Sequence, residues 1–296
     1  MTPSVAYRHC RTAAHGHYEN FPVASTLLPR RIRGPVAAIY LFARRADDLA
    51  DEGERPARER LAALDAMEQD LDRTLDGSPP EDALWQALAD GITRFDLPDG
   101  PFRDLLSAFR QDVTQDRYAD FDEVLAYCER SANPVGRLLL HLTGTDTPEN
   151  LAASDAICTG LQLVNFLQDL HQDFVERARL YIPRHDLGRH DVSEELLASG
   201  APDARVRALL ARQIDRAAWW LQQGADLPRR LPGRFGLEIR LILRGGWRIV
   251  RRLRLEKPLD PFARPRLGPG DWLWIVGGLP IPAAAHAGGG NGTTSP

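Results

Sequence analysis

Two clusters of acidic residues carry the strongest chemical signal in the sequence. In the first, Asp47, Asp48 and Asp51 follow an apolar segment. Asp47 and Asp51 are four residues apart, so on a helix both carboxylates would project from one face. Their like charges repel each other and lower helix stability at neutral pH. A hard cation that takes oxygen ligands, such as Mg²⁺, would offset this repulsion.

The second cluster contains Asn165, Asp169 and Asp173, which again recur every four residues. Apolar side chains fill the rest of this segment, and burying three oxygen-bearing groups there is costly unless they have partners. A metal ion bound to diphosphate has the chemistry of such a partner. The repeated spacing therefore predicts two helices that face each other across a metal–diphosphate site. The alternative interpretation is that both clusters are solvated faces of surface helices.

Composition and the missing motifs exclude several classes of protein. The formal net charge of -4 argues against a dedicated nucleic-acid binder. Three widely spaced cysteines indicate a reducing compartment rather than a disulfide framework. The sequence shows no signal-peptide pattern, HExxH pair, GxSxG elbow or glycine-rich phosphate loop. We therefore expect a cytoplasmic protein without a membrane span, a catalytic histidine-bound metal or a bound nucleotide.

Apolar periodicity predicts an all-α chain with one helical-bundle domain over residues 1–255. Three- and four-residue spacing recurs throughout, and alternating β-branched runs are almost absent. We expect a short helix before residue 29, a helix from residue 34 through the first acidic cluster, and helices over 56–75, 81–95, 101–114, 121–142, 149–174, 193–199, 203–223 and 234–253. Residues 256–296 are rich in proline and glycine, which predicts a partly disordered tail.

Several segments in chain order resemble the squalene/phytoene synthase family, and together they span residues 15–255. They are LLP at 27–29, AIYLFARRADDLAD at 38–51, YC at 127–128, VG at 135–136, and NFLQD at 165–169 through YIP at 181–183. The resemblance implies the all-α isoprenoid synthase fold, a single bundle around a central cavity that binds Mg²⁺ and an isoprenoid diphosphate.

The same resemblance assigns roles to individual residues. The implied metal-site residues are Asp47, Asp48, Asp51, Asn165, Asp169 and Asp173. The implied substrate-binding residues are Arg44, Asn165, Gln162, Phe21 and Gln168, and the implied catalytic residues are Tyr127, Tyr40 and Tyr181. Two alternatives stay open at this point. Arg44 could serve only as an ion-pair partner of the carboxylates, and Tyr40 and Tyr181 could be core tyrosines with satisfied hydroxyls.

Within the family, three features are most similar to the hydroxysqualene synthases of bacterial hopanoid synthesis. They are the YENFPVAS segment at 18–25, the SANPVGRLLL segment at 131–140 and Gln168, where related condensing enzymes usually carry arginine. This likeness implies conversion of presqualene diphosphate to hydroxysqualene. Condensation of two prenyl diphosphates, such as farnesyl diphosphate, is the alternative reaction. A catalytically inactive helical scaffold is the alternative of another class, and the intact aspartate clusters argue against it.

Two further expectations concern local structure and partners. The Asn133-Pro134 pair should break the helix expected over 121–142, either to hold a water molecule or only to form a packing kink. A basic stripe of Arg244, Arg248, Arg251, Arg252 and Arg254, together with Trp272 and Trp274, suggests peripheral contact with the inner membrane face. The alternative is a solvated basic helix beside a packed tail. Neighbouring enzymes of the same pathway are the other expected partners.

Overall fold

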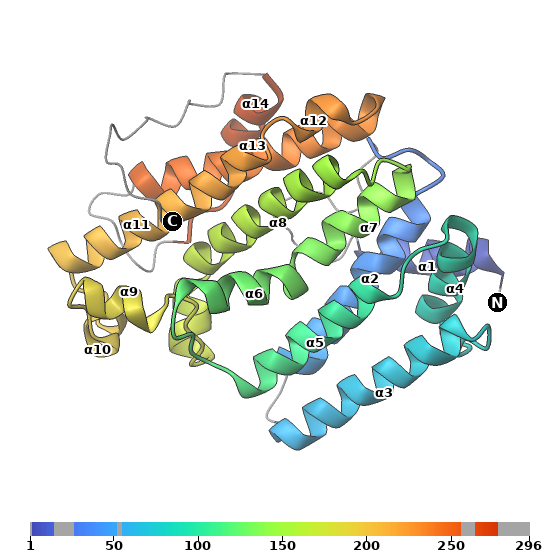
Figure 1. Ribbon diagram of the computed structural model, residues 1–296, viewed down its shortest axis with the longest axis horizontal. Helices are drawn as coiled ribbons and strands as arrows, with labels where there is room; N and C mark the ends of the chain where they lie inside the picture. The colour runs from blue at the N-terminus through green and yellow to red at the C-terminus, as the bar shows by residue number, and fades with distance from the viewer. Residues whose placement is uncertain (1, 15–26, 52–54, 256–263, 278–296) are drawn as a thin grey trace.

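A computed structural model describes residues 2–14, 27–51, 55–255 and 264–277 (Figure 1). These residues fold into helices, and their only extended pairing is one isolated parallel bridge between Arg117 and Leu180. In chain order the helices are α1 (Pro3–Ala14), α2 (Arg33–Asp51), α3 (Ala57–Leu75), α4 (Ala83–Phe95), α5 (Gly100–Thr114), α6 (Phe121–Ser131), α7 (Asn133–Thr143), α8 (Pro148–Gln168), the π-helical turn η1 (Gln172–Glu176), α9 (Arg184–Arg189), α10 (Glu194–Ala198), α11 (Ala204–Gln223), α12 (Leu227–Arg230), α13 (Gly233–Leu255) and α14 (Pro269–Gly277). The predicted all-α class is confirmed.

Helix α8 forms the centre of the molecule. It packs against α6 and α7 on one side and against α11 and α13 on the other (Figure 1). It is buried around most of its circumference, as expected for a helix surrounded by neighbours. Gly136 lets α7 approach it closely, because a Cβ at that position would lie 2.3 Å from the Ser154 hydroxyl oxygen. Any larger residue at 136 would have to displace the Ser154 and Cys158 side chains on α8.

Side-chain caps fix where several helices begin. Asp120 accepts a hydrogen bond from the backbone N–H of Glu123 at the start of α6, and Thr147 accepts one from Asn150 at the start of α8. Such caps satisfy backbone donors that have no partner within the helix. The starts of α6 and α8 therefore follow from local sequence, and these two helices carry much of the site described below.

The structure confirms one expected irregularity and differs from the expected helices in two other places. The helix over 121–142 is broken at Asn133-Pro134 as expected, because Ala132, with a φ of -120°, leaves the helical range one residue before Asn133. The helix expected over 149–174 ends at Gln168 and continues as η1. The short helices α9, α12 and α14 were not expected. Helix α14 begins at Pro269, a residue whose fixed φ suits the first helical turn.

No helix among the described residues is long and apolar enough to cross a membrane. The division between a domain ending at residue 255 and a tail from residue 256 stays a prediction. Within that tail, residues 264–277 lie against the helical bundle, and we call this segment the C-terminal strap.

Candidate active site

The first acidic cluster lies in the last turn of α2. Arg44 pairs there with Asp47 at 3.3 Å and with Asp48 at 2.7 Å. Burial, and then the charge of Asp51, raises the pKa of Asp47 to about 7. The helix dipole adds to this accumulation of negative charge, because the negative end of a helix favours cations and the last turn of α2 carries no basic residue. The cluster thus concentrates negative charge that a bound cation would relieve.

The second cluster lies at the end of α8, which is also a negative helix end. Backbone hydrogen bonds keep the four-residue spacing through the bend, since Asp169 N–H donates to the Asn165 carbonyl and Asp173 N–H to the Asp169 carbonyl. Burial, and then the charge of Asp169, raises the pKa of Asp173 to about 7. The prediction that these residues share one face is thus consistent with the backbone, although the helix itself ends at Gln168.

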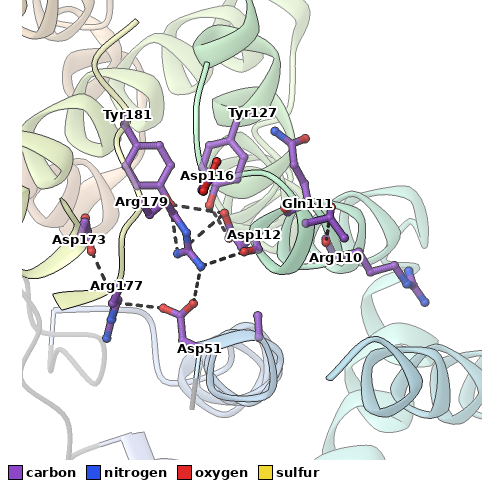
Figure 2. Close-up of polar contacts among 12 residues, drawn as sticks. Asp51, Arg110, Gln111, Asp112, Asp116, Tyr127, Asp173, Arg177, Arg179 and Tyr181 are labelled. Carbon is purple, nitrogen blue, oxygen red and sulfur yellow. Dashed lines mark hydrogen bonds and ion pairs between the residues drawn. The ribbon is translucent and has the colours of Figure 1, made fainter. Parts of the chain in front are cut away.

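Two arginines bring the clusters together, and neither was among the residues expected at the site. Arg177 Nη1 lies 3.0 Å from Asp51 Oδ2 and 3.5 Å from Asp173 Oδ1, so it joins α2 to η1 (Figure 2). Arg179 Nη2 lies 2.8 Å from the other oxygen of Asp51. The two predicted clusters therefore meet across one pair of guanidinium groups. The arginines directly follow the second cluster in sequence, which is the signal that could have revealed them.

A third carboxylate, Asp112 on α5, completes this network. Tyr127 donates a 2.7 Å hydrogen bond to Asp112 Oδ2, and Tyr181 donates a 3.4 Å bond to Oδ1 (Figure 2). Arg179 Nη2 donates to the Asp112 backbone carbonyl at 3.0 Å. Burial raises the pKa of Asp112 to about 6. Asp112 was not among the residues expected at the site, although Asp112 and Asp116 repeat the four-residue spacing of the other clusters.

Aromatic rings cover this network. The rings of Phe166 and Tyr181 stack with centroids 3.7 Å apart, and Tyr127 lies 5.5 Å from Tyr181 and 6.1 Å from Phe166. Burial raises the pKa values of Tyr127 and Tyr181 well above the ordinary value, so both hydroxyls remain protonated donors. The site therefore combines carboxylates, arginines and tyrosine donors beside a wall of aromatic faces.

For most of the other predicted residues, the structure gives a helix and a degree of burial. Tyr40 is partly buried on α2, seven residues before Asp47 and so on the same helical face. Gln162 and Asn165 are partly buried on α8. Phe21 lies outside the described residues. The assigned roles of these residues stay predictions.

The C-terminal strap reaches the second cluster directly. Arg264 Nε lies 2.5 Å from Asp169 Oδ1, and the side-chain amide of Gln168 donates a 2.7 Å hydrogen bond to the Pro265 carbonyl. Gln168 is buried in this contact, with 5% of its surface exposed. The residue that most distinguishes this second aspartate motif thus holds the strap in place. Its predicted part in substrate binding stays a prediction.

The far end of the strap is fixed on α13. Asp271, whose side chain is fully buried, pairs with Arg248 at 2.5 Å and Arg252 at 2.6 Å, while Arg244 donates to the Ile275 carbonyl. Three arginines of the expected basic stripe therefore bind the strap. A fourth, Arg254, pairs with Asp215 on the surface. These contacts favour the packed-tail alternative over an open basic face.

Replacing Asp271 with alanine is expected to release the strap. The change leaves Arg248 and Arg252 without their shared carboxylate, and breaking a buried ion pair in this way costs about 3 kcal/mol. Hydrogen exchange should become faster across residues 264–277, while the core of α8 stays protected. Asp215→Ala, which removes an exposed pair with Arg254, is the matched control and should change neither region. Unchanged protection of the strap in Asp271→Ala would contradict this assignment.

Comparison with known proteins identifies the family. The family model for squalene/phytoene synthase matches residues 14–269. The chain belongs to the squalene/phytoene synthase family. It is 35% identical to a hydroxysqualene synthase from Sinorhizobium fredii over 96% of this chain and 95% of that protein. It is also 34% identical to a 15-cis-phytoene synthase from Synechococcus elongatus, over 77% of each chain.

Solved structures show the same fold. The crystal structure of squalene synthase HpnC from Alicyclobacillus acidocaldarius superposes with a TM-score of 0.79 at 34% identity, covering 85% of this chain and 94% of that chain. The expected isoprenoid synthase fold is thereby confirmed, and this squalene/phytoene synthase family member is an enzyme of isoprenoid synthesis.

The carboxylates fit a shared metal–diphosphate site better than an all-protein metal cage. Among the described residues, no group of three or more His, Cys, Asp or Glu side chains converges on one point as a metal site. Mg²⁺ usually takes only one or two carboxylates and completes its shell with water and substrate phosphates. The raised pKa values of Asp47 and Asp173 indicate negative charge that the protein itself compensates only in part. The donor set therefore suits Mg²⁺ that arrives with diphosphate.

Proposed function

We propose that this family member converts presqualene diphosphate to hydroxysqualene by loss of diphosphate, rearrangement of the carbocation and capture of water. The observation that carries this proposal is the similarity to a hydroxysqualene synthase over 96% of the chain. The buried contact of Gln168 with Pro265 supports it, because position 168 then supplies no cation for a second diphosphate. Related condensing enzymes usually have arginine there.

Charge compensation is the first requirement of this reaction. Asp47, Asp51, Asp169 and Asp173, with Asn165, would hold Mg²⁺, which would neutralise the departing diphosphate. Arg177 and Arg179 lie between these carboxylates, so a guanidinium that leaves Asp51 could bind a diphosphate oxygen through paired hydrogen bonds. Arg44 would do the same from α2.

Orientation and cation stabilisation fall to the aromatic residues. Asp112 fixes the hydroxyls of Tyr127 and Tyr181, so both rings hold one orientation beside Phe166. Aromatic faces attract cations, and this attraction strengthens when water is excluded. Tyr40, on the same face of α2 as Asp47, would extend this lining. The proposed role of these side chains is to shelter a carbocation until water captures it.

A second candidate reaction is condensation of two prenyl diphosphates, and the similarity to a 15-cis-phytoene synthase favours it. One assay separates the two. Presqualene diphosphate and farnesyl diphosphate are supplied separately with Mg²⁺, with and without NADPH, in ¹⁸O-labelled water. We expect labelled alcohol from presqualene diphosphate alone. Squalene formed only with NADPH, or efficient coupling of farnesyl diphosphate, would favour the second candidate.

We also propose that the enzyme contacts a membrane surface peripherally, because its substrate and product are poorly soluble in water. Trp272 and Val276 on α14 are exposed apolar side chains that suit this contact.

A further inference from the structure

Two polar side chains, Asn133 on α7 and Thr159 on α8, are buried against each other, and the Ser131 hydroxyl lies close by in sequence at the end of α6. The Thr159 hydroxyl donates a 3.1 Å hydrogen bond to Asn133 Oδ1, and both residues are 3% exposed. The Ser131 hydroxyl oxygen is buried as well, and it makes no hydrogen bond with any described part of the chain. Leaving a buried hydroxyl without a hydrogen-bond partner is energetically unfavourable. We call Ser131, Asn133 and Thr159 the hydroxyl–amide cluster. Its groups can form hydrogen bonds with a small polar molecule.

The cluster continues the aromatic part of the active site along two helices. Ser131 follows Tyr127 by four residues on α6, so the two share a face about one turn apart, about 6 Å along the axis. Thr159 precedes Phe166 by seven residues on α8, which is two turns and about 10 Å on one face. Because Tyr127 and Phe166 contact each other, their helical faces are turned toward one another. The cluster therefore lies along the same facing surfaces of α6 and α8, one turn beyond Tyr127 and two turns before Phe166.

The helix break adds a backbone acceptor at this place. Pro134 has no N–H, so it cannot donate to the carbonyl of Arg130 four residues earlier. Ala132 already has a non-helical backbone, which separates α6 from α7 at this point. A buried water molecule typically makes about three hydrogen bonds to polar groups that lack other partners. The Ser131 hydroxyl has no partner among the described residues, and the Arg130 carbonyl lacks its usual donor from position 134. The Asn133 amide has capacity for hydrogen bonds beyond the one from Thr159.

We propose that the hydroxyl–amide cluster positions the water molecule that captures the carbocation, an inference that rests on the function proposed above. The carbon–oxygen bond to diphosphate breaks and its electron pair leaves with diphosphate. A lone pair of the held water then forms the new carbon–oxygen bond. The resulting oxonium gives its extra proton to the released diphosphate, so no oxidant, reductant or further reactant is needed.

The neutrality of the cluster explains why an alcohol forms rather than an alkene. A carbocation beside a strong base loses a proton, whereas a neutral hydroxyl or amide is too weak a base to take one. Ser131, Asn133 and Thr159 carry no charge, so they hold water without deprotonating the cation. They act as positioning residues, and they should control which product forms more than how fast diphosphate leaves.

The test therefore measures the partition between products. Thr159→Val removes the hydroxyl and keeps the shape of the side chain, and Ser131→Ala removes the unsatisfied hydroxyl. With presqualene diphosphate and Mg²⁺, we expect the ratio of alcohol to alkene to fall about tenfold in each variant, which is about 1.4 kcal/mol in relative barrier. Release of inorganic diphosphate should stay within about threefold of wild type.

Two controls make the result specific. Thr159→Ser restores a hydroxyl and should restore the alcohol. Ser154→Ala removes a different buried hydroxyl from α8 and should leave the product ratio unchanged. An unchanged ratio in both Thr159→Val and Ser131→Ala would overturn the water site, as would a loss of alcohol in strict proportion to diphosphate release. If wild type makes hydroxysqualene and both variants give the same ratio of alcohol to alkene as wild type, the proposed water site is wrong but the proposed function stands. If wild type makes none, the proposed function fails as well.

Discussion

Alanine at Asp47 or at Asp169 is expected to reduce turnover by about 100- to 1000-fold or more while the fold stays intact. Each change removes one carboxylate from the site that would hold Mg²⁺ and diphosphate, and losing one pre-organised charge contact typically costs about 2.7–4 kcal/mol in the transition state. Steady-state kinetics at saturating Mg²⁺ measure the loss, and far-UV circular dichroism checks the fold. Near-normal rates in either variant would contradict the metal-site assignment.

The metal-free protein provides an independent measurement at Asp47. Its pKa is raised from 3.8 to about 7 in the folded state, so folding disfavours the ionised form. The stability that the protonated form provides is fully present below pH 3.8 and is lost as the pH rises through about 7. Asp47→Asn cannot ionise, so its melting temperature should exceed that of wild type increasingly from pH 5 to pH 8. A constant difference would show that Asp47 is not strained.

This pairing of outcomes is informative because the two measurements move in opposite directions. A residue kept only for stability would destabilise the protein when replaced. If a residue is kept to bind a cation, replacing it should stabilise the metal-free protein and inactivate the enzyme. Asp48→Asn is the matched control, because the Asp48 carboxylate already pairs with Arg44 at 2.7 Å. We expect it to have the smaller effect in both measurements.

Replacing Asp112 with alanine is expected to lower the free energy of unfolding by about 3 kcal/mol or more. The change leaves the buried hydroxyls of Tyr127 and Tyr181 without their acceptor and takes a carboxylate away from Arg179, which is itself buried. Removing one member of a buried charged network costs about 3–5 kcal/mol. Urea unfolding at pH 7.5 measures the change.

Asparagine at position 112 separates charge from hydrogen bonding. Asp112→Asn keeps an acceptor for Tyr127, so it should cost less stability than alanine. Asp116→Ala, one turn further and exposed at the surface, is the control and should stay within about 0.5 kcal/mol of wild type. If Asp112→Ala unfolds at the same urea concentration as wild type, the tyrosines and Arg179 do not depend on this carboxylate.

The sequence was sufficient to predict the parts of the site that lie on regular helices. The spacing of Asp47 and Asp51 on α2 follows from helix periodicity and needs no knowledge of the fold. Asp169 and Asp173 keep the same spacing past the end of α8 only because backbone hydrogen bonds continue through the bend. The contact between the two clusters could not be predicted in this way. It depends on Arg177 and Arg179, which lie after the end of α8, where Ala178 has the unusual φ of 56° and periodicity no longer applies.

The role of Asp112 was missed for a related reason. Its spacing to Asp116 matches the other clusters, but Asp112 is buried while Asp116 is exposed, so only the first belongs to the site. The expected basic stripe on α13 is the opposite case, in which composition alone suggests a role at the surface. Arg244, Arg248 and Arg252 have the composition of a lipid-binding face, yet their contacts are with the strap. In both cases burial decides the role, and burial depends on segments distant in the chain.

The strap also determines when during biosynthesis the active site can be completed. Gln168 and Pro265 are separated by 97 residues, and Asp51 and Arg179 by 128. A chain emerging from the ribosome forms its N-terminal segments first, so both aspartate clusters exist well before Arg264 is translated. A nascent or prematurely terminated chain would therefore carry every acidic residue of the site without the cation that neutralises Asp169. Such a chain should hold more uncompensated negative charge at the site than the full-length protein does.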